Sequence, residues 1–267
     1  MILPLAATLL ATGLFAGFLA GLLGVGGGIV LVAVLFHVFT EFGIDEAVRM
    51  HLAVGTSLST IIFTAWRSVG AHRARGAVDD ALLRAWVVPI LLGVVLGSAL
   101  ARVLAGPALM TVFAVVALLV AFHMAFGREE WRLADLPPAG AARHVLGATI
   151  GMLSVLMGLG GGALGVPTFT LLGVPIRRAV GTAAGLGLLI AIPGTLGFVL
   201  AGLGVPGRPP FSLGYVNGVG FALIVPATML AAPWGARVAH AVPRTALRRA
   251  FAIFLAITSV RMLLELH

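Results

Sequence analysis

The stretch Leu22-Leu23-Gly24-Val25-Gly26-Gly27-Gly28-Ile29-Val30 interrupts a long hydrophobic run with four glycines, and Gly158-Leu159-Gly160-Gly161-Gly162 does the same in the second half of the chain. Consecutive glycines form helix poorly and leave the backbone uncovered, so in lipid they persist only where protein or a wet cavity surrounds them. Two such breaks at equivalent places predict a pair of interrupted membrane helices with a binding site between them.

The composition is that of an integral membrane protein. Of the 267 residues, 60% are hydrophobic and 10% are charged, and the mean hydropathy of +1.14 exceeds what a water-soluble domain of this size carries. Short loops hold nearly all the charge, so we expect a single transmembrane domain over residues 1–267. The formal net charge of +8 lies in these loops, and we attribute it to membrane topology rather than to nucleic-acid binding.

The hydrophobic runs occur in the same order in two halves. Repeat one covers residues 1–126, a cytoplasmic connector 127–143 and repeat two 144–267. After each break Gly55-Thr56 recurs as Gly181-Thr182, which indicates an internal duplication. The predicted segments are 2–39 and 144–174, each interrupted at its glycines, and 52–66, 85–101, 108–126, 179–203, 213–236 and 247–264.

The arginines decide between two topologies for the interrupted runs. If each run folds back as a hairpin of broken helices, 13 of the 17 arginines lie on one side of the membrane and 4 on the other. If each run crosses once, the division is 9 against 8, which is no bias. The positive-inside rule therefore favours hairpins, giving an all-α polytopic protein of two inverted repeats with about five helical segments each. The C-terminus is then periplasmic in a cell inner membrane.

Several kinds of site lack the residues they need. All basic residues counted as Lys or Arg are arginine, so a P-loop has no lysine, and the chain contains no cysteine. No Asp or Glu falls in the middle of a predicted span, which leaves no carboxylates for a metal site, a sodium site or an intramembrane acid/base enzyme. We expect no catalytic residue, no metal and no cofactor.

A negatively charged solute fits what is present. A half-helix that begins at an unwound glycine turn directs unpaired N–H groups and a partial positive charge into the protein centre. Hydroxyl side chains follow each hairpin in the Gly-Thr segments. The expected substrate-binding residues are Gly26, Gly27, Gly28, Thr56, Ser57, Gly160, Gly161, Gly162 and Thr182.

Other conspicuous residues have simpler interpretations. The spacing of Gly13 and Gly17, and of Gly93 and Gly97, predicts close helix packing. His51 is interpreted as a surface histidine at a helix start. Pro167 is interpreted as the restart of a helix after the second break.

The pattern of a GxGGG stretch, then Val-Pro, then an alanine-rich Gly-Thr-Ser segment resembles the TauE/SafE group of sulfite and organosulfonate permeases. It is matched at Gly158 to Pro167 with Gly181-Thr182, and at Gly24 to Gly28 with Gly55-Thr56-Ser57. The sequence departs from the pattern at Ala33, where proline is expected, and at Ala183, which lacks the hydroxyl of Ser57. The resemblance implies secondary transport of sulfite, sulfonates such as sulfoacetate, or related sulfur oxyanions.

The prediction is thus a permease that moves a small anion by alternating access, with coupling to protons as a hypothesis that rests on the missing sodium-site carboxylates. A passive anion channel is one alternative. An intramembrane enzyme or an assembly factor is the other.

Overall fold

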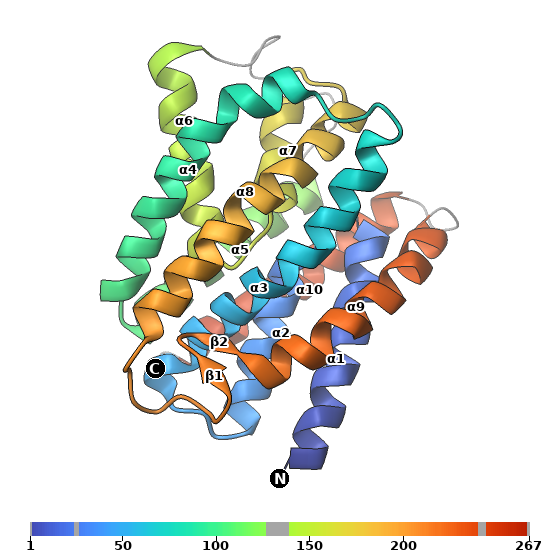
Figure 1. Ribbon diagram of the computed structural model, residues 1–267. Helices are drawn as coiled ribbons and strands as arrows, with labels where there is room; N and C mark the ends of the chain where they lie inside the picture. Colours follow the sequence, from blue (N-terminus) through green and yellow to red (C-terminus); the bar gives the residue numbers. More distant parts are fainter. Residues whose placement is uncertain (1, 24–26, 127–138, 240–243, 266–267) are drawn as a thin grey trace.

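The computed structural model describes residues 2–23, 27–126, 139–239 and 244–265, and this part of the chain is almost entirely helical (Figure 1). The first half contains α1 (Ile2–Leu23), α2 (Gly28–Glu41), α3 (Glu46–Arg73), α4 (Asp80–Val103) and α5 (Gly106–Phe126). The second half contains α6 (Gly140–Leu156), α7 (Gly161–Leu171), α8 (Ile176–Gly202), α9 (Gly218–Ala239) and α10 (Arg244–Leu264). Two short antiparallel strands, β1 (Ser212–Leu213) and β2 (Val216–Asn217), precede α9.

Both predicted interruptions are present. Helix α1 ends at Leu23 and α2 begins at Gly28, preceded by Gly27 in a left-handed conformation with φ of 67°. In the second half α6 ends at Leu156 and α7 begins at Gly161, with Gly158 at φ of 65°. Glycine adopts such positive φ angles without steric cost. Gly27 and Gly158 therefore allow the chain to turn between the end of one helix and the start of the next. Gly26 lies outside the described residues.

Successive helices run in alternate directions, so that the two termini lie toward the same, lower end of Figure 1. Five described helices precede residues 127–138 and five follow them. Because five is an odd number, the second set starts from the opposite end of the molecule, which is the inverted arrangement. The packing repeats accordingly: α1 lies along α9 as α6 lies along α4, α5 packs on α10, and α3 crosses α8. The predicted fold class is confirmed.

Small residues allow the close helix contacts. A methyl group built on Gly17 of α1 would lie 2.5 Å from the Thr228 Cα of α9, and one on Gly97 of α4 would lie 2.9 Å from the Met152 carbonyl oxygen of α6. Glycine at these positions lets two backbones approach, which supplies dispersion contacts where lipid provides no hydrophobic driving force. The predicted packing role of these glycines is confirmed.

The outer surface is apolar. Four described helical segments are long and hydrophobic enough to cross a bilayer: 80–103, 106–126, 176–202 and 218–235. Their exposed side chains include Leu92, Leu119, Leu196 and Leu230, each more than half exposed, as expected for a lipid-facing belt. Helix α3 is longer but more polar, and its hydroxyl residues Thr56, Ser57, Ser59 and Thr60 are all buried in the protein.

Two sequence-based boundaries are wrong. The span predicted to start at Leu213 starts at Gly218, because residues 212–217 form the β1–β2 turn instead. Pro167 does not restart a helix, since α7 has already begun six residues earlier at Gly161 and carries the proline in its interior. The glycines themselves supply the helix start.

Candidate functional site at the two glycine breaks

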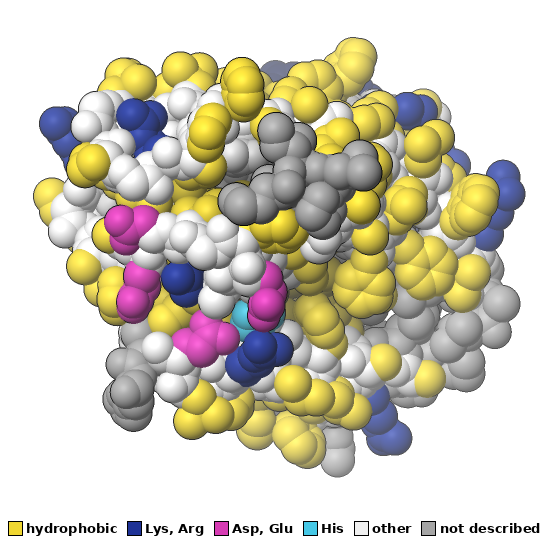
Figure 2. Space-filling model, turned by 90° about the horizontal axis from the view of Figure 1, so that it is seen from below, with side chains coloured by type: hydrophobic (Ala, Val, Ile, Leu, Met, Phe, Trp, Pro, Cys, Tyr) yellow, Lys and Arg dark blue, Asp and Glu magenta, His cyan; other side chains and the backbone are white. Residues whose placement is uncertain are grey.

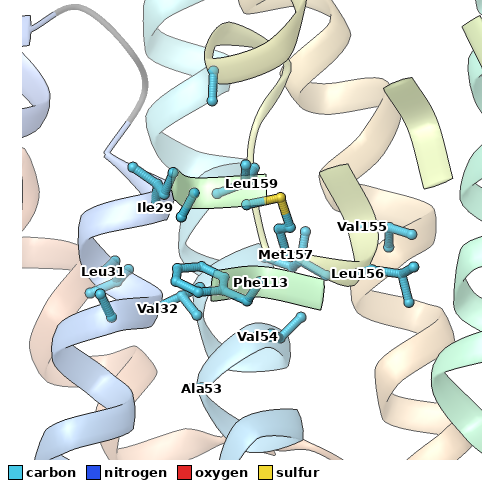
Figure 3. Close-up of a cluster of buried hydrophobic side chains, with 14 of the residues drawn as sticks. Ile29, Leu31, Val32, Ala53, Val54, Phe113, Val155, Leu156, Met157 and Leu159 are labelled. Atoms are coloured by element: carbon cyan, nitrogen blue, oxygen red, sulfur yellow. The ribbon is translucent and has the colours of Figure 1, made fainter. Parts of the chain in front are cut away.

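The two breaks meet in the middle of the protein. A methyl group built on Gly28, the first residue of α2, would lie 2.9 Å from the Gly158 carbonyl oxygen and 3.2 Å from the Leu159 Cα. The Ser57 hydroxyl of α3 donates to the Gly158 carbonyl at 2.8 Å, and its oxygen lies 3.5 Å from the Gly28 carbonyl oxygen. One buried serine therefore joins both breaks. Figure 3 shows a cluster of buried apolar side chains from the two breaks and their neighbours, among them Ile29 and Val32 of α2 and Leu159 of the second break.

The geometry brings two helix N-termini together. From this contact α2 and α7 run toward opposite ends of the molecule (Figure 1). The first N–H groups of an α-helix have no partner within the helix, and they carry about half a positive charge at its N-terminus. Two such termini near Gly28 and Gly161 bring N–H donors to the protein centre, next to the carbonyl ends of α1 and α6.

The second break also packs against α8. A side chain at Gly161 would collide with the Ala183 carbonyl and would lie 2.5 Å from the Leu186 Cβ and 2.7 Å from the Gly187 nitrogen. Gly160 has more room, because a methyl group there would meet only the Ile61 side chain at 3.2 Å and the Gly187 Cα at 4.0 Å. Gly162 is half-buried in the first turn of α7. The breaks are thus enclosed by α3 and α8 in this conformation.

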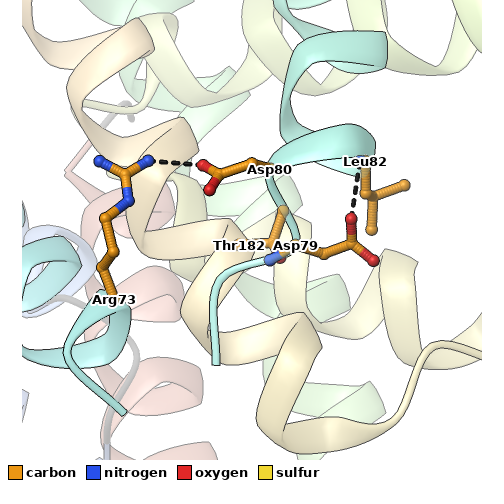
Figure 4. A network of polar contacts seen from close by, with 5 residues as sticks. All are labelled: Arg73, Asp79, Asp80, Leu82 and Thr182. Carbon is orange, nitrogen blue, oxygen red and sulfur yellow. Dashed lines mark hydrogen bonds and ion pairs between the residues drawn. The ribbon is translucent and has the colours of Figure 1, made fainter. Parts of the chain in front are cut away.

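Thr56 and Thr182 have different partners from Ser57. The Thr56 oxygen accepts a hydrogen bond from the Asn217 backbone N–H at 2.9 Å, and the Thr182 oxygen accepts from the Asp79 backbone N–H at 3.0 Å (Figure 4). Asn217 and Asp79 occupy equivalent positions at the N-termini of α9 and α4. Each accepts through its side chain from the backbone N–H three residues later, in Gly220 and Leu82 respectively.

The glycine before each threonine completes this contact. A side chain at Gly55 would collide with the Tyr215 carbonyl, and one at Gly181 would collide with the Ala77 carbonyl. Each Gly-Thr pair therefore lets the segment before a helix of the other repeat lie directly against α3 or α8, and then holds it by a hydrogen bond. We call the two contacts, Thr56 with Asn217 and Thr182 with Asp79, the threonine clamps.

The charges outside this region lie at the ends of the molecule. Arg73 and Asp80 form an exposed ion pair at 2.6 Å near the Thr182 clamp, and Arg178 lies 3.8 Å from the Asp79 carboxylate. At the opposite end a cavity of about 310 Å³ is lined in part by Glu46, Arg49 and Glu265. Figure 2 looks at this end and shows acidic and basic side chains gathered there within an otherwise hydrophobic surface.

A second cavity opens at the side of the molecule. It has a volume of about 320 Å³ and lies between α3, α8 and the start of α9, with Ser59, Phe63 and Thr195 in its wall. Neither this cavity nor the one at the end includes the glycine breaks in its lining.

His51 is not a surface residue, contrary to the sequence-based interpretation. It is 2% exposed, its Nε2 lies 3.1 Å from the Ala101 carbonyl oxygen, and its ring stacks on Tyr215 with centroids 4.7 Å apart. Because a carbonyl only accepts, Nε2 carries the proton. Burial raises the pKa of the Tyr215 phenol, which stays neutral in the turn between β1 and β2. This stacking contact packs the Tyr215 turn against α3, close to the Thr56 clamp.

Comparison with known proteins places the chain in a family. The model of the family described as "Sulfite exporter TauE/SafE" matches residues 9–262. The chain belongs to the TauE/SafE family. A "probable membrane transporter protein" of Haemophilus influenzae is 31% identical over 256 residues, covering 96% of this chain and 97% of the relative. A protein of the same description from Methanocaldococcus jannaschii is 26% identical over 234 residues, covering 87% of this chain and 82% of the relative. No solved structure matches the chain.

This TauE/SafE protein is accordingly a multi-pass membrane transporter. Of the site residues predicted from sequence, the structure brings Gly28, Ser57, Gly160 and Gly161 together. Gly27 and Gly162 are neighbours of these residues in the chain. The Thr56 and Thr182 oxygens do not face the breaks but accept the backbone hydrogen bonds of the threonine clamps. Ile61 and Gly187 also lie at the breaks and were not predicted. The signal was available in the sequence, since both lie five residues after the threonine of a Gly-Thr pair.

Proposed function

We propose that this transporter moves a small sulfur-containing anion, such as sulfite or an organosulfonate, across the inner membrane by alternating access. The observation that carries the proposal is the meeting of the two breaks, where Gly28 at the α2 N-terminus lies beside Gly158, three residues before α7 begins. Free N–H groups and the aligned peptide dipoles of two helices favour a negative charge at that point. The anion is held by the backbone at Gly27–Gly28 and Gly160–Gly162, and the Ser57 hydroxyl between them turns from the Gly158 carbonyl to donate to it.

The inverted repeat supports a moving mechanism rather than a fixed pore. Each threonine clamp joins a helix of one repeat to the start of a helix of the other, so the clamps lie symmetrically on the two sides of the breaks. We take the conformation in which α3 and α8 enclose the breaks as the occluded one, from which rocking of one repeat against the other would open one side at a time.

Coupling to protons is part of the proposal, as is a periplasmic C-terminus. The arginine distribution supports the orientation, because the described arginines around the α3–α4 turn and the start of α8, among them Arg73, Arg75 and Arg178, fall at the end opposite to the termini. The chain has no cysteine, so a single cysteine replacing Arg75 or Glu41, both exposed, reports the side of each end by its reaction with an impermeant maleimide. Labelling of position 75 from the periplasm would refute the orientation.

The transport proposal is tested by counterflow of labelled sulfite in proteoliposomes. Gly28→Ala places a methyl group 2.9 Å from both the Gly158 oxygen and the Ile61 Cδ1, so we expect at least a tenfold loss of flux with the protein still inserted. Gly70→Ala is the matched control, since it lies in α3 with nothing within 4 Å, and it should stay within twofold of wild type.

The other outcomes of this experiment identify the rivals. Flux without trans-stimulation indicates a passive anion channel. Flux that Gly28→Ala leaves unchanged, or no flux of any sulfur anion, favours an enzyme or assembly factor. Transport that ignores an imposed pH gradient and membrane potential removes the proton coupling.

A further inference from the structure

The two repeats differ at one position beside the breaks. Gly55-Thr56 of α3 corresponds to Gly181-Thr182 of α8, and both helices continue without interruption, so Ile61 corresponds to Gly187. The contacts support this register, because the next equivalent pair, Ala65 and Ala191, packs with Ile61 in one small apolar cluster where α3 crosses α8.

Ile61 covers both breaks. Its Cδ1 lies 2.9 Å from the methyl position of Gly28, and its Cγ2 lies 3.2 Å from that of Gly160. The side chain is 3% exposed. A single aliphatic side chain therefore lies beside the N-termini of α2 and α7 at once, and it forms an apolar wall on the α3 side of the place where they converge.

Gly187 does the reverse on the α8 side. A methyl group at this position would lie 3.6 Å from the Gly161 nitrogen and 3.1 Å from the Ala65 Cβ. As glycine it places no side chain against the amide of the first α7 residue, which is buried beside it. The convergence point is thus bounded by the polar Gly161 amide next to Gly187 and by the apolar Ile61 side chain.

We infer that Ile61 is a specificity-determining residue that limits the solute to a compact inorganic sulfur oxyanion, an inference that rests on the proposed function. The charged oxygens of the anion face the N–H groups on the Gly187 side, because these groups stabilise negative charge. Any organic substituent on sulfur must then point toward α3, where Ile61 occupies the space. Sulfite fits this arrangement, whereas a sulfonate with an ethyl or longer substituent does not.

The test measures initial rates of counterflow for sulfite, methanesulfonate and ethanesulfonate in proteoliposomes. Wild type should transport sulfite fastest and ethanesulfonate at the background rate. Ile61→Ala removes the wall, so the ethanesulfonate-to-sulfite rate ratio should rise at least tenfold. Ile61→Val removes one methylene from the wall and should raise the ratio by a smaller factor. It serves as the readout if the alanine variant is not monodisperse in detergent.

Two further variants separate a size limit from a general packing effect. Ile62→Ala, on the neighbouring position that lines the side cavity, is the matched control and should leave the ratio unchanged. Gly187→Ala covers the Gly161 amide and should raise the KM for sulfite about tenfold, as loss of one charge-assisted hydrogen bond implies.

The outcomes distinguish this inference from the proposed function. Two results would overturn the inference alone while sulfite flux is present. One is the same ethanesulfonate-to-sulfite rate ratio in wild type, Ile61→Val and Ile61→Ala. The other is wild-type transport of ethanesulfonate at the sulfite rate. Absence of flux for every sulfur anion in wild type overturns the proposed function together with the inference.

Discussion

Replacing the threonine of either clamp by valine should destabilise the protein, and the amount follows from the contacts. Thr56 is fully buried and Asn217 is 5% exposed, so Thr56→Val leaves the Asn217 backbone N–H facing a methyl group away from water. A buried donor without a partner costs about 1–3 kcal/mol in proteins. Measured side-chain hydrogen bonds between membrane helices average about 0.6 kcal/mol with a maximum near 1.7 kcal/mol.

We therefore expect Thr56→Val to lower the free energy of unfolding by about 1 kcal/mol, or roughly fivefold in the equilibrium constant. Thr182→Val should cost a similar amount through the Asp79 N–H. Because the two clamps share no partner, the double variant should lose the sum, about 2 kcal/mol. A helix start held by a weaker contact also frays more readily, so protection of the first turns of α9 and α4 from hydrogen exchange should fall selectively in the corresponding single variant.

The measurement is reversible unfolding in mixed dodecylmaltoside and SDS micelles, followed by tryptophan fluorescence. Thr60→Val is the matched control: Thr60 lies on the same helix and is 2% exposed, but its hydroxyl donates to the Ser57 carbonyl of its own helix at 2.7 Å. Its loss should stay within about 0.5 kcal/mol, since such back-bonding adds little to helix stability. A Thr56→Val protein as stable as Thr60→Val, or a double variant no weaker than either single one, would refute the clamps.

Three further changes test other contacts. Ser57→Ala removes the donor to the Gly158 carbonyl at 2.8 Å, so sulfite flux should fall several-fold while Trp fluorescence of the folded protein is unchanged; full flux would contradict a role at the breaks. Gly17→Val should abolish a monodisperse detergent peak because the α1–α9 contact has no room, whereas the exposed Leu14→Val should not. Arg73→Ala should change the unfolding free energy by less than about 0.5 kcal/mol, because its ion pair is exposed; a larger loss in an unfolding titration would show that the pair is structural.

Much of the architecture was predictable because it depends on short stretches of sequence. The glycine-rich stretches 24–28 and 158–162 form helix poorly and so mark a break in each long hydrophobic run, and hydropathy marks where the other segments lie. The uneven arginines then chose hairpins over single crossings, and alternate helices of the structure run as that choice requires. Boundaries were less certain where a turn is itself apolar, as at Leu213.

The sequence determined that two broken helices would exist, but only the tertiary structure decided what faces them. Thr56 and Ser57 are adjacent, yet a helix turns by about 100° per residue, so one contacts Asn217 and the other Gly158. Helix α3 is buried over most of its surface. Its pattern of polar residues therefore could not predict which face of the helix points toward which neighbour. These partners lie 161 and 101 residues away, in the other repeat, and the docking of that repeat decides the contacts that each hydroxyl makes.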